Sequence, residues 1–530
     1  MFCNSHYIHV GGKTHNKSPR KTSKAKISHL KKLPFKTQEE RISNLIKDCI
    51  IKTNLGDIRG FTKDGVNSFL GIPYSNGLSV EKRFCPPEPI EPWDNLLDAT
   101  KNGPIPPQRP SRLARAMGDF TFPFNEDCLT LNIWGPTNKK EKLPVIFWIH
   151  GGAFVSGAGS LDWYNGERFA SDQKIILVGI NYRLGALGFL SHPDISRGNL
   201  GIQDQILALE WVNQNIESFG GDPANITVMG QSAGAISTFA LLANNKARHF
   251  INNVIFQSGR YDSFETPDVA SEKTEKFARL AGLKVKQLGE MPLEDILNTQ
   301  SALAQEEAIF ASTNIPFLPV IDGEIIPNNT HAAAIEGAMN KNVMLGSTHD
   351  EMHAFISGNP EIEEASHKQV EDVFKREFMD DWEVILKDCK NRAPGATSME
   401  ILSLGLNIAN FEGQTAALAA DLSEKGINAW LYRFDWKRPT SPLGACHCIE
   451  LPFLFNTFEK WLPPMIAGLD LNEGLNLSKI LQKTWGTFAR YGDPNHDDIA
   501  YWPKFSKNDR AEIHWNKYIE VIQKPTKRST

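Results

Sequence analysis

Near the middle of the chain the sequence reads Ile226-Thr-Val-Met-Gly-Gln-Ser-Ala-Gly-Ala235. An apolar run leads into Gly230, and an apolar, helix-like stretch follows Ser232. A Gly-x-Ser-x-Gly string is weak by itself, and the order strand, turn, helix is what gives it meaning. Such a turn holds the serine in a strained conformation, and small neighbours let the strand and the helix pack around it. The pattern predicts Ser232 as a nucleophile; the alternative is a Gly-rich turn with an idle serine.

Further apolar runs lie on both sides of this turn, and helix-like stretches separate them. Continuous apolar runs are typical of strands covered on both faces, and here they occupy residues 145–149, 175–179, 226–229, 254–256 and 343–345. Residues 203–217 and 233–243 have the character of helices. This alternation predicts an α/β fold with a large, mostly parallel central sheet and helices on both faces. Residues 50–60 and 66–74 predict a small N-terminal antiparallel sheet.

The beginning of the chain differs from the rest. The first 38 of the 530 residues hold nine basic side chains and no acidic one, whereas the remainder holds 48 basic and 62 acidic side chains. We expect residues 1–45 to be a basic, disordered extension, because they hold few apolar side chains to bury. Residues 46–525 are expected to form a single domain, since no long linker or repeat interrupts them. A targeting role for the extension is the alternative, because such heads resemble organelle transit peptides.

Composition excludes several classes of function. A formal charge of −5 argues against a dedicated nucleic-acid binder, and 41% apolar residues is ordinary for a globular protein. No run approaches the roughly 20 apolar residues that span a bilayer, so no transmembrane segment is expected. Seven cysteines are few and odd in number, which favours a reducing compartment, the cytoplasm, over a disulfide scaffold. None of these patterns determines the oligomeric state.

A serine nucleophile needs donors for the oxyanion that develops during attack. The string His150-Gly-Gly-Ala-Phe154 follows the apolar run 145–149. Its glycines would let backbone N–H groups face a substrate, so we expect an oxyanion hole formed by Gly151, Gly152 and Ala233. His150 is a candidate general base as well, but it sits in the loop that shapes this hole and is interpreted as structural.

The general base and the acid that orients it are expected after the serine, at the ends of later strands. Glu351 and His447 are suitably placed. By chemistry alone, however, Asp350 competes with Glu351, and His349 or His353 competes with His447. Spacing does not separate these candidates.

Two groups of residues raise the question of a metal site. His349 and His353 are four residues apart, but the helical zinc motif places its Glu directly after the first His, whereas Glu351 stands two after it. Cys446 and Cys448 flank a histidine without a distant second pair of ligands. We expect no metal and no cofactor.

Several longer motifs identify a family. Together with the strings above, the chain resembles the type-B carboxylesterases, an α/β-hydrolase family that includes bacterial para-nitrobenzyl esterases and animal cholinesterases, and it is more similar to the former. The likeness covers residues 50–505, and its motifs are Phe69-Leu-Gly-Ile-Pro-Tyr74, Glu126-Asp-Cys-Leu-Thr-Leu-Asn132, Asn181-Tyr-Arg-Leu-Gly185, Asn199-Leu-Gly201, Gln257-Ser-Gly259 and Phe488-Ala-Arg-Tyr-Gly-Asp-Pro-Asn495. The resemblance implies the α/β-hydrolase fold.

The resemblance also implies the site. In the family the acid is the Glu of an Asp-Glu-Gly string, and the base is the His before a Glu-Leu-Pro-Phe-like segment, which carries over to Glu351 and His447. With Ser232 they form a Ser-His-Glu triad that hydrolyses small to medium carboxylic esters through an acyl-enzyme, with water as the second reactant. The alternative is a non-catalytic binding or adhesion protein on the same fold. Such relatives typically lose a triad member, and here all three are present.

Some positions depart from the family pattern. Met352 replaces the Gly after the acid, and Cys448 replaces the Gly or Ala that often follows the histidine, so substrate preference is open. In secreted relatives Cys128 pairs with an upstream cysteine that is missing here, which leaves Cys85 as a remaining candidate partner. Residues 94–133 contain no Trp to stack on a quaternary ammonium, so a choline ester is not the expected substrate.

Overall fold

The computed structural model describes residues 46–523, except for 119, 121, 138–140, 314, 439–440, 462–463 and 467. The predicted basic extension, residues 1–45, lies outside the described residues. Its predicted disorder and the boundary at residue 45 therefore stay predictions.

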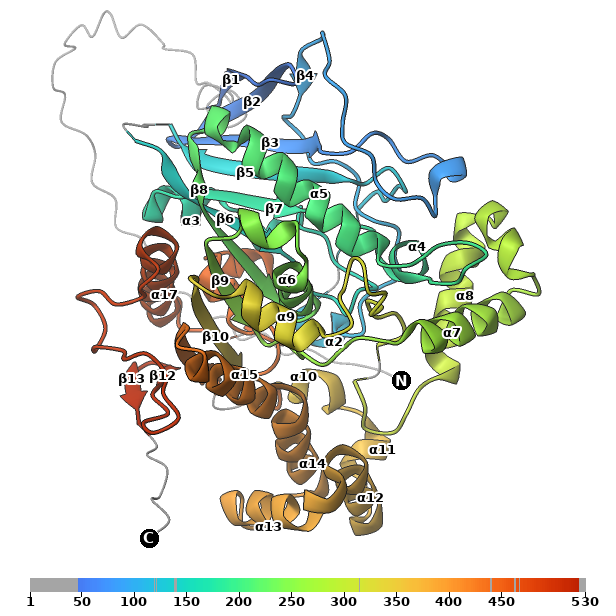
Figure 1. The fold of residues 1–530 in the computed structure, drawn as a ribbon. Coiled ribbons are helices and arrows are strands. Elements are labelled where there is room, and N and C mark those ends of the chain that lie inside the picture. The colour runs from blue at the N-terminus through green and yellow to red at the C-terminus, as the bar shows by residue number, and fades with distance from the viewer. Residues whose placement is uncertain are drawn as a thin grey trace, which may run out of the picture. The chain divides into compact units, whose positions relative to one another are not determined.

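Strands of the described chain form one large sheet (Figure 1). They are β1 (Lys47–Lys52), β2 (Asp57–Lys63), β3 (Val66–Pro73), β4 (Leu97–Asp98), β5 (Thr130–Pro136), β6 (Leu143–Ile149), β7 (Ile176–Ile180), β8 (Gly221–Gln231), β9 (Asn253–Gln257), β10 (Asn342–Thr348), β11 (Asn428–Phe434), β12 (Glu512–Trp515) and β13 (Glu520–Ile522). The strand order is β1-β2-β3-β5-β7-β6-β8-β9-β10-β11-β12-β13, with β4 paired to β2.

The centre of this sheet is parallel. Strands β7, β6, β8, β9, β10, β11 and β12 are parallel to their neighbours within this block, and β6 to β10 coincide with the five predicted buried runs, of which 175–179 begins one residue before β7. The predicted parallel core is confirmed. The expected N-terminal antiparallel strands are β1 to β3, and they continue the large sheet because β3 pairs with β5 and β5 pairs with β7.

Both faces of the central strands are buried, which explains their continuous apolar runs. Along β6, Val145, Phe147 and Ile149 belong to one apolar cluster, while Ile146 and Trp148 belong to the other. Side chains alternate between the two faces of a strand, so a run with no polar position is required when helices cover both.

Helices cover the two faces (Figure 1). The first cluster takes residues from α5 (Leu200–Asn215), α6 (Ala233–Ala243), α7 (Pro267–Leu280), α8 (Leu293–Glu306), α9 (Thr330–Gly337) and α15 (Gly413–Glu424). The second takes residues from α2 (Ala114–Met117), α3 (Glu167–Gln173), α16 (Leu451–Leu454) and α17 (Leu471–Tyr491). The helix predicted over 203–217 begins earlier, at Leu200, after Asn199 adopts a left-handed conformation with a φ of 56°.

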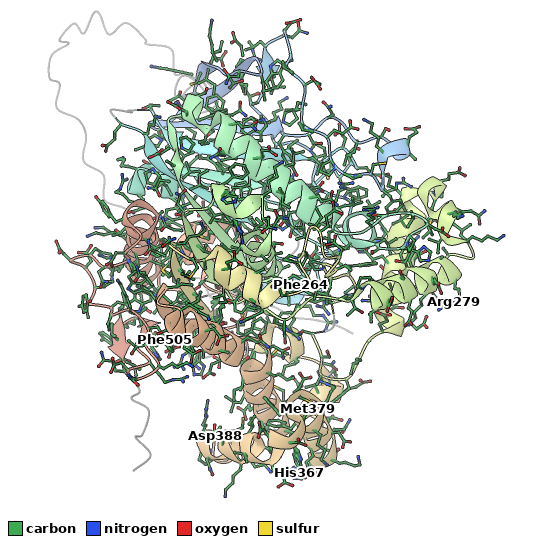
Figure 2. The ribbon with its side chains drawn as sticks, viewed as in Figure 1. Phe264, Arg279, His367, Met379, Asp388 and Phe505 are labelled. Atoms are coloured by element: carbon green, nitrogen blue, oxygen red, sulfur yellow. The ribbon has the colours of Figure 1, made fainter. Side chains whose placement is uncertain are left out.

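A third cluster lies away from the sheet. It is formed mainly by α12 (His367–Phe378), α13 (Trp382–Arg392) and α14 (Ser398–Asn407), with α10 (His353–Ile356) and α11 (Pro360–Glu363) beside them. Figure 2 labels His367, Met379 and Asp388 on this helical group. From α14 the chain passes through a π-helical turn, Ile408–Glu412, into α15, which leads back to the sheet.

Two other expectations concern cysteines and membranes. All six cysteines of the described residues are free. Cys128 is buried and unpaired, and Cys85 is therefore not its partner. Between residues 46 and 523, as far as they are described, no helix has the length and apolar character to cross a bilayer.

Candidate active site

Ser232 lies in the sharp turn between β8 and α6. Its φ is 57°, a value that non-glycine residues rarely adopt, and its N–H donates to the carbonyl of Gln257 over 2.8 Å. Close packing explains the flanking glycines: a Cβ on Gly230 would lie 2.1 Å from the carbonyl oxygen of Gly234, and one on Gly234 would lie 2.0 Å from that of Ile149. The local geometry is therefore the strained turn that the sequence predicts.

His447 and Glu351 form a buried pair. The Nδ1 atom of His447 lies 2.5 Å from Oε2 of Glu351, and each side chain is 1% exposed. The other carboxylate oxygen, Oε1, accepts a hydrogen bond from the N–H of Thr348 over 2.7 Å. Because both oxygens are engaged, the carboxylate is held in one orientation against the imidazole.

Ser232 and His447 line the same cavity, although 215 residues separate them. The second imidazole nitrogen, Nε2, lies 3.1 Å from the amide nitrogen of Gln231, which also donates to Sγ of Cys448 over 3.3 Å. Sequence reasoning did not single out Gln231. Its position directly before the serine, at the end of β8, is the signal that could have identified it.

The predicted oxyanion donors lie in two segments next to Ser232. Gly151 and Gly152 follow β6, and a Cβ on Gly151 would lie only 2.9 Å from Cβ of Ser232. Ala233 is the first residue of α6, where N–H groups lack a helical acceptor. Within the described residues no hydrogen bond uses the N–H of Gly151, Gly152 or Ala233.

His150 is buried in the wall of this loop. Its Nδ1 atom lies 2.7 Å from the carbonyl oxygen of Gly151, and its ring stacks on Tyr182 with centroids 4.5 Å apart. Burial lowers the pKa of His150 to about 4, so the imidazole is neutral. His150 is absent from the described lining of the cavity that contains Ser232. This placement fits a structural role in shaping the loop.

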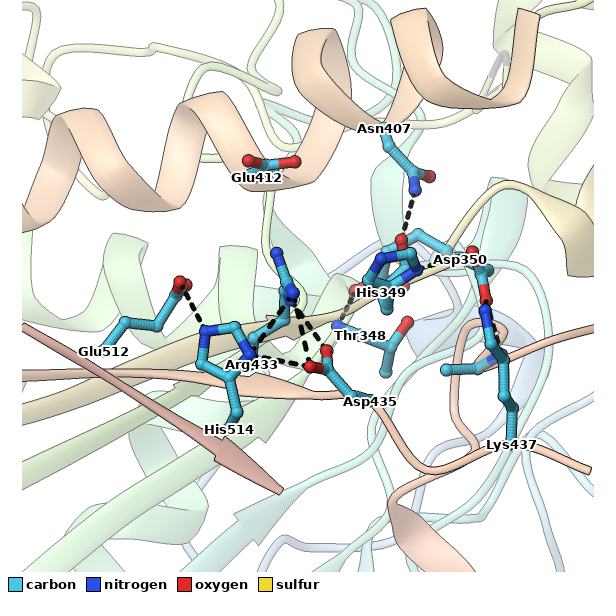
Figure 3. A network of polar contacts seen from close by, with 12 residues as sticks. Thr348, His349, Asp350, Asn407, Glu412, Arg433, Asp435, Lys437, Glu512 and His514 are labelled. Atoms are coloured by element: carbon cyan, nitrogen blue, oxygen red, sulfur yellow. Dashed lines mark hydrogen bonds and ion pairs between the residues drawn. The ribbon is translucent and has the colours of Figure 1, made fainter. Parts of the chain in front are cut away.

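Asp350, the competing carboxyl, has different partners (Figure 3). Its oxygens lie 2.7 Å from Nδ1 of His349, 2.9 Å from the N–H of Ala445 and 3.1 Å from Nζ of Lys437. Burial opposes ionisation, but the hydrogen bonds from His349 and Ala445 and the positive charges outweigh it and hold the pKa of Asp350 far below its usual value. Asp350 therefore belongs to a polar network rather than to the surroundings of His447.

His349 and His353, which suggested zinc, do not join a larger group of possible ligands among the described residues. No group of three or more His, Cys, Asp or Glu side chains in the described part of the chain could hold a metal ion. His349 binds Asp350, and burial lowers the pKa of His353. Cys446 and Cys448 are both buried, and Cys448 lines the cavity with a φ of 72°.

The walls around His447 are aromatic. Phe355 and Phe411 lie with ring centroids 5.1 and 5.2 Å from the imidazole. Phe411 comes from the π-helical turn, a type of helical irregularity that often occurs at functional sites. Trp163 and Arg112 also line the cavity. None of these four residues was predicted, because none of them belongs to a motif that carries the resemblance.

A second buried carboxyl, Glu450, lies three residues after His447. Its Oε1 accepts a hydrogen bond from the amide of Gln257 over 3.2 Å, while Oε2 has no partner among the described residues. Burial and the nearby charge of Glu351 raise the pKa of Glu450 to about 7. It belongs to the Glu-Leu-Pro-Phe segment that follows His447, and the sequence patterns predict no role for this acid.

Comparison with known proteins decides the family. A family model described as the carboxylesterase family matches residues 47–529. A para-nitrobenzyl esterase of Bacillus subtilis is 33% identical over 491 residues, which cover 90% of this chain and 96% of that protein. The chain belongs to the carboxylesterase family. This carboxylesterase is also 31% identical to an acetylcholinesterase of Bungarus fasciatus, over 88% of this chain and 82% of that protein.

Solved structures give the same result for the fold. A carboxylesterase of Geobacillus stearothermophilus has a TM-score of 0.81 and 31% identity, and the match covers 90% of this chain and 98% of that one. The α/β-hydrolase fold and the greater likeness to bacterial esterases are confirmed. The protein is a carboxylic ester hydrolase, and the alternative of a non-catalytic binding protein is not favoured.

Proposed function

We propose that Ser232, His447 and Glu351 are the catalytic triad of this carboxylic ester hydrolase. The observation that supports this assignment most is the buried His447–Glu351 pair, whose histidine lines the same cavity as the strained Ser232. Nδ1 binds the carboxylate, so the lone pair of Nε2 can accept a proton. The Ser232 hydroxyl gives its proton to Nε2 as it attacks the ester carbonyl, and Glu351 stabilises the imidazolium.

Gln231 takes part in this step through its position. Its amide lies at Nε2 of His447, the atom that must receive the serine proton. The amide therefore has to yield this nitrogen to Ser232 when the substrate binds, while its contact with Cys448 gives it an alternative partner. Gln231 is a positioning residue in this scheme.

The oxyanion and the second half of the reaction complete the cycle. The N–H groups of Gly151, Gly152 and Ala233 bind the negatively charged oxygen of the tetrahedral intermediate. The alcohol leaves with the proton from His447, and Ser232 keeps the acyl group. Water then attacks the acyl-enzyme with His447 as the base, and the carboxylic acid is released.

The cavity favours small to medium esters over choline esters. A Trp does line it, Trp163, but one face of that ring is stacked on Trp461 at 4.7 Å between centroids. Arg112 lines the cavity as well, and no Asp or Glu occurs among the described lining residues. Among the described lining residues a quaternary ammonium group would therefore find no carboxylate.

Labelling with a fluorophosphonate probe tests the nucleophile. The wild type should be labelled, and Ser232→Ala should lose both labelling and turnover, the latter by at least about 10³-fold on 4-nitrophenyl butyrate. Ser111→Ala is the matched control, because Ser111 lines the same cavity. The assignment is wrong if Ser232→Ala is labelled as strongly as the wild type and Ser111→Ala is not.

Two further proposals concern the chain as a whole. Residues 46–525 form a single catalytic domain, and the basic segment 1–45 is dispensable for catalysis, because every proposed site residue lies after residue 150. We also propose a cytoplasmic location, which the free cysteines of the described residues support. A chain that begins at residue 42 should keep the turnover and melting temperature of the full chain. Aggregation or lost turnover would contradict this proposal. A changed cellular distribution alone would indicate that the segment has a targeting role.

A further inference from the structure

The active-site cavity is too small for a whole ester substrate. Its volume is about 50 Å³, whereas a single group the size of a water molecule needs about 10–15 Å³. Small-molecule sites in proteins commonly have volumes of about 300–1,000 Å³. The space beside Ser232 therefore holds the ester group and a few atoms next to it, and the rest of the substrate has to extend beyond this cavity.

A larger cavity adjoins the active-site cavity, and we call it the α8 cavity. Its volume is about 370 Å³, and it is lined by residues within 109–112, 300–305 and 308–316 together with Val155. The two cavities share three lining residues, which are Ser111, Arg112 and Val155. A substrate that outgrows the space beside Ser232 therefore has a second space of ordinary ligand-site size directly next to it.

Val155 stands where the two cavities meet, close to the proposed oxyanion donors. Its N–H donates to the carbonyl of Gly152 over 3.0 Å, so a tight turn joins the two residues. Inside this turn Ala153 and Phe154 have φ values of 53° and 58°, and Phe154 is fully buried. Such conformations persist only where the surrounding structure holds them, so the turn fixes the place of Val155. A substrate whose carbonyl oxygen lies at Gly152 thus has the α8 cavity just beyond Val155.

One wall of the α8 cavity comes from a single face of α8 and from the chain after it. Gln300 and Ala304 are four residues apart, as are Ser301 and Gln305, and residues with this spacing lie on the same face of a helix. Ile309 follows the end of the helix and is 54% exposed although it lines the cavity. An apolar group bound there would remove the Ile309 side chain from water, which favours binding.

The charged side chains of the α8 cavity do not favour a charged ligand. Arg109 forms an ion pair with Glu294 and donates to Asn298 over 2.6 Å, and Arg112 has a partner as well. No Asp or Glu occurs among the described residues that line this cavity. The other eleven lining residues are neutral, and six of them are Ala, Val, Ile or Pro. The α8 cavity therefore suits an apolar group of a substrate better than an ionised one.

We propose that the α8 cavity is a subsite for an apolar chain of the ester substrate, so that this enzyme prefers esters with a medium-length alkyl chain to the shortest esters. Each methylene that leaves water in this cavity contributes binding free energy that an acetyl or ethyl group lacks. The inference deepens the proposed function and rests on it, because it takes Ser232 as the nucleophile of the adjoining cavity. The chain belongs either to the acid or to the alcohol of the ester, and both sources share this chemistry.

Two substrate pairs test the proposal and locate the chain. For a chain on the acyl side, 4-nitrophenyl octanoate is compared with 4-nitrophenyl acetate. For a chain on the alcohol side, octyl acetate is compared with ethyl acetate, and the released acid is titrated. In the wild type kcat/KM for the long member of at least one pair should exceed that for the short member by at least about 10-fold, because several methylenes leave water.

Variants then assign the preference to the α8 cavity. Ala304→Phe and Ala308→Phe each add a ring to its wall, so the ratio of long to short kcat/KM should fall to near one. Ala308 is exposed and lies beyond the end of α8, where a larger side chain leaves the packing of the helix intact. Ala302→Phe is the matched control, because Ala302 lies on α8, is half-buried like Ala304 and lines neither cavity among the described residues. It should keep the wild-type ratio.

The failures can be told apart. The proposal is overturned if both wild-type ratios are near one, or if Ala302→Phe lowers the ratio as much as the two cavity variants do. It is overturned as well if the cavity variants slow long and short esters equally, because the α8 cavity would then be only part of the entrance. Each of these results leaves the triad intact, provided that Ser232→Ala abolishes turnover of 4-nitrophenyl acetate. If Ser232→Ala retains that turnover, the proposed function itself has failed. Melting temperatures of all variants show whether a lost ratio reflects misfolding.

Discussion

Asp350 and Glu351 are consecutive residues after β10, yet they belong to different surroundings. Glu351 is fully buried and binds the imidazole of His447. Asp350 binds Lys437, whose side chain is 48% exposed, together with His349. What distinguishes the two carboxylates is therefore not residue type but the partner that folding brings to each oxygen, and this difference is the basis on which we propose Glu351 as the triad acid.

The surroundings of Asp350 belong to a wider polar region (Figure 3). Directly after β11, Asp435 binds both Arg433 on β11 and His514 on β12, and His514 also lies 3.0 Å from Glu512. Burial opposes ionisation of Asp435, but the hydrogen bonds from His514 and Arg433 lower its pKa to about 2. None of these four residues is in the described lining of the active-site cavity, so this network is expected to act on stability rather than on turnover.

The largest predicted effect separates the two carboxylates by activity. Glu351→Gln should lower kcat/KM on 4-nitrophenyl butyrate by about 10³–10⁴-fold, because the amide no longer orients and stabilises the protonated imidazole. Asp350→Asn should cost less than about 10-fold. Both variants differ from the wild type by one charge and almost no volume, so each is the control for the other. The reverse ranking would make Asp350 the triad acid.

The next effect separates them by stability. Asp350→Asn should destabilise the fold by about 1–3 kcal/mol at pH 7, since it removes charge-assisted hydrogen bonds. The folded-state pKa of Asp350 lies below its unfolded value, so its ionised form stabilises the protein above the unfolded pKa and this contribution is lost as the pH falls through the folded pKa. Urea unfolding at pH 7 and at pH 4 or lower measures this contribution. The difference in unfolding free energy between the wild type and Asp350→Asn should shrink in acid. A difference that grows in acid contradicts the proposed ion pairs.

Glu450 should show the opposite dependence on pH. Its folded-state pKa of about 7 lies above its unfolded value, so the wild type loses stability as the pH rises between the two values. Glu450→Gln removes that loss. The melting temperature of Glu450→Gln minus that of the wild type should therefore be larger at pH 8 than at pH 4.5. The change in this difference should be equivalent to on the order of 1 kcal/mol. A difference in melting temperature that does not vary with pH would show that Glu450 is ionised in the folded protein from pH 4.5 to pH 8.

The last prediction is that metal chelation has no effect on activity. Incubation with EDTA should leave activity on 4-nitrophenyl butyrate unchanged, because His349 is engaged by Asp350 and the proposed mechanism contains no metal. His349→Gln should retain most of the activity. Loss of activity on chelation, followed by its return with zinc, would instead assign His349 and His353 to a metal site.

Much of the fold could be predicted because its signals are local. Runs such as residues 145–149 are apolar at every position, and a strand can bury both faces only in that way. The turn at Ser232 needs Gly230 and Gly234, and both can be read from neighbouring letters. The continuation of β1 to β3 into the large sheet could not be predicted, because the pairing of β3 with β5 joins residues 57 to 70 positions apart, from Pro73 with Thr130 to Val66 with Pro136.

By itself the sequence determined the parallel core, the strained turn at Ser232 and, through the family resemblance, the choice of Glu351 and His447. Only the tertiary structure placed Gln231 at Nε2 of His447 and brought Arg112 to the wall of the serine cavity. The physical reason is the range of the interactions. Burial and backbone strain are imposed by adjacent residues, whereas a hydrogen bond or a cavity wall joins side chains whose distance depends on how separate strand ends converge at one edge of the sheet.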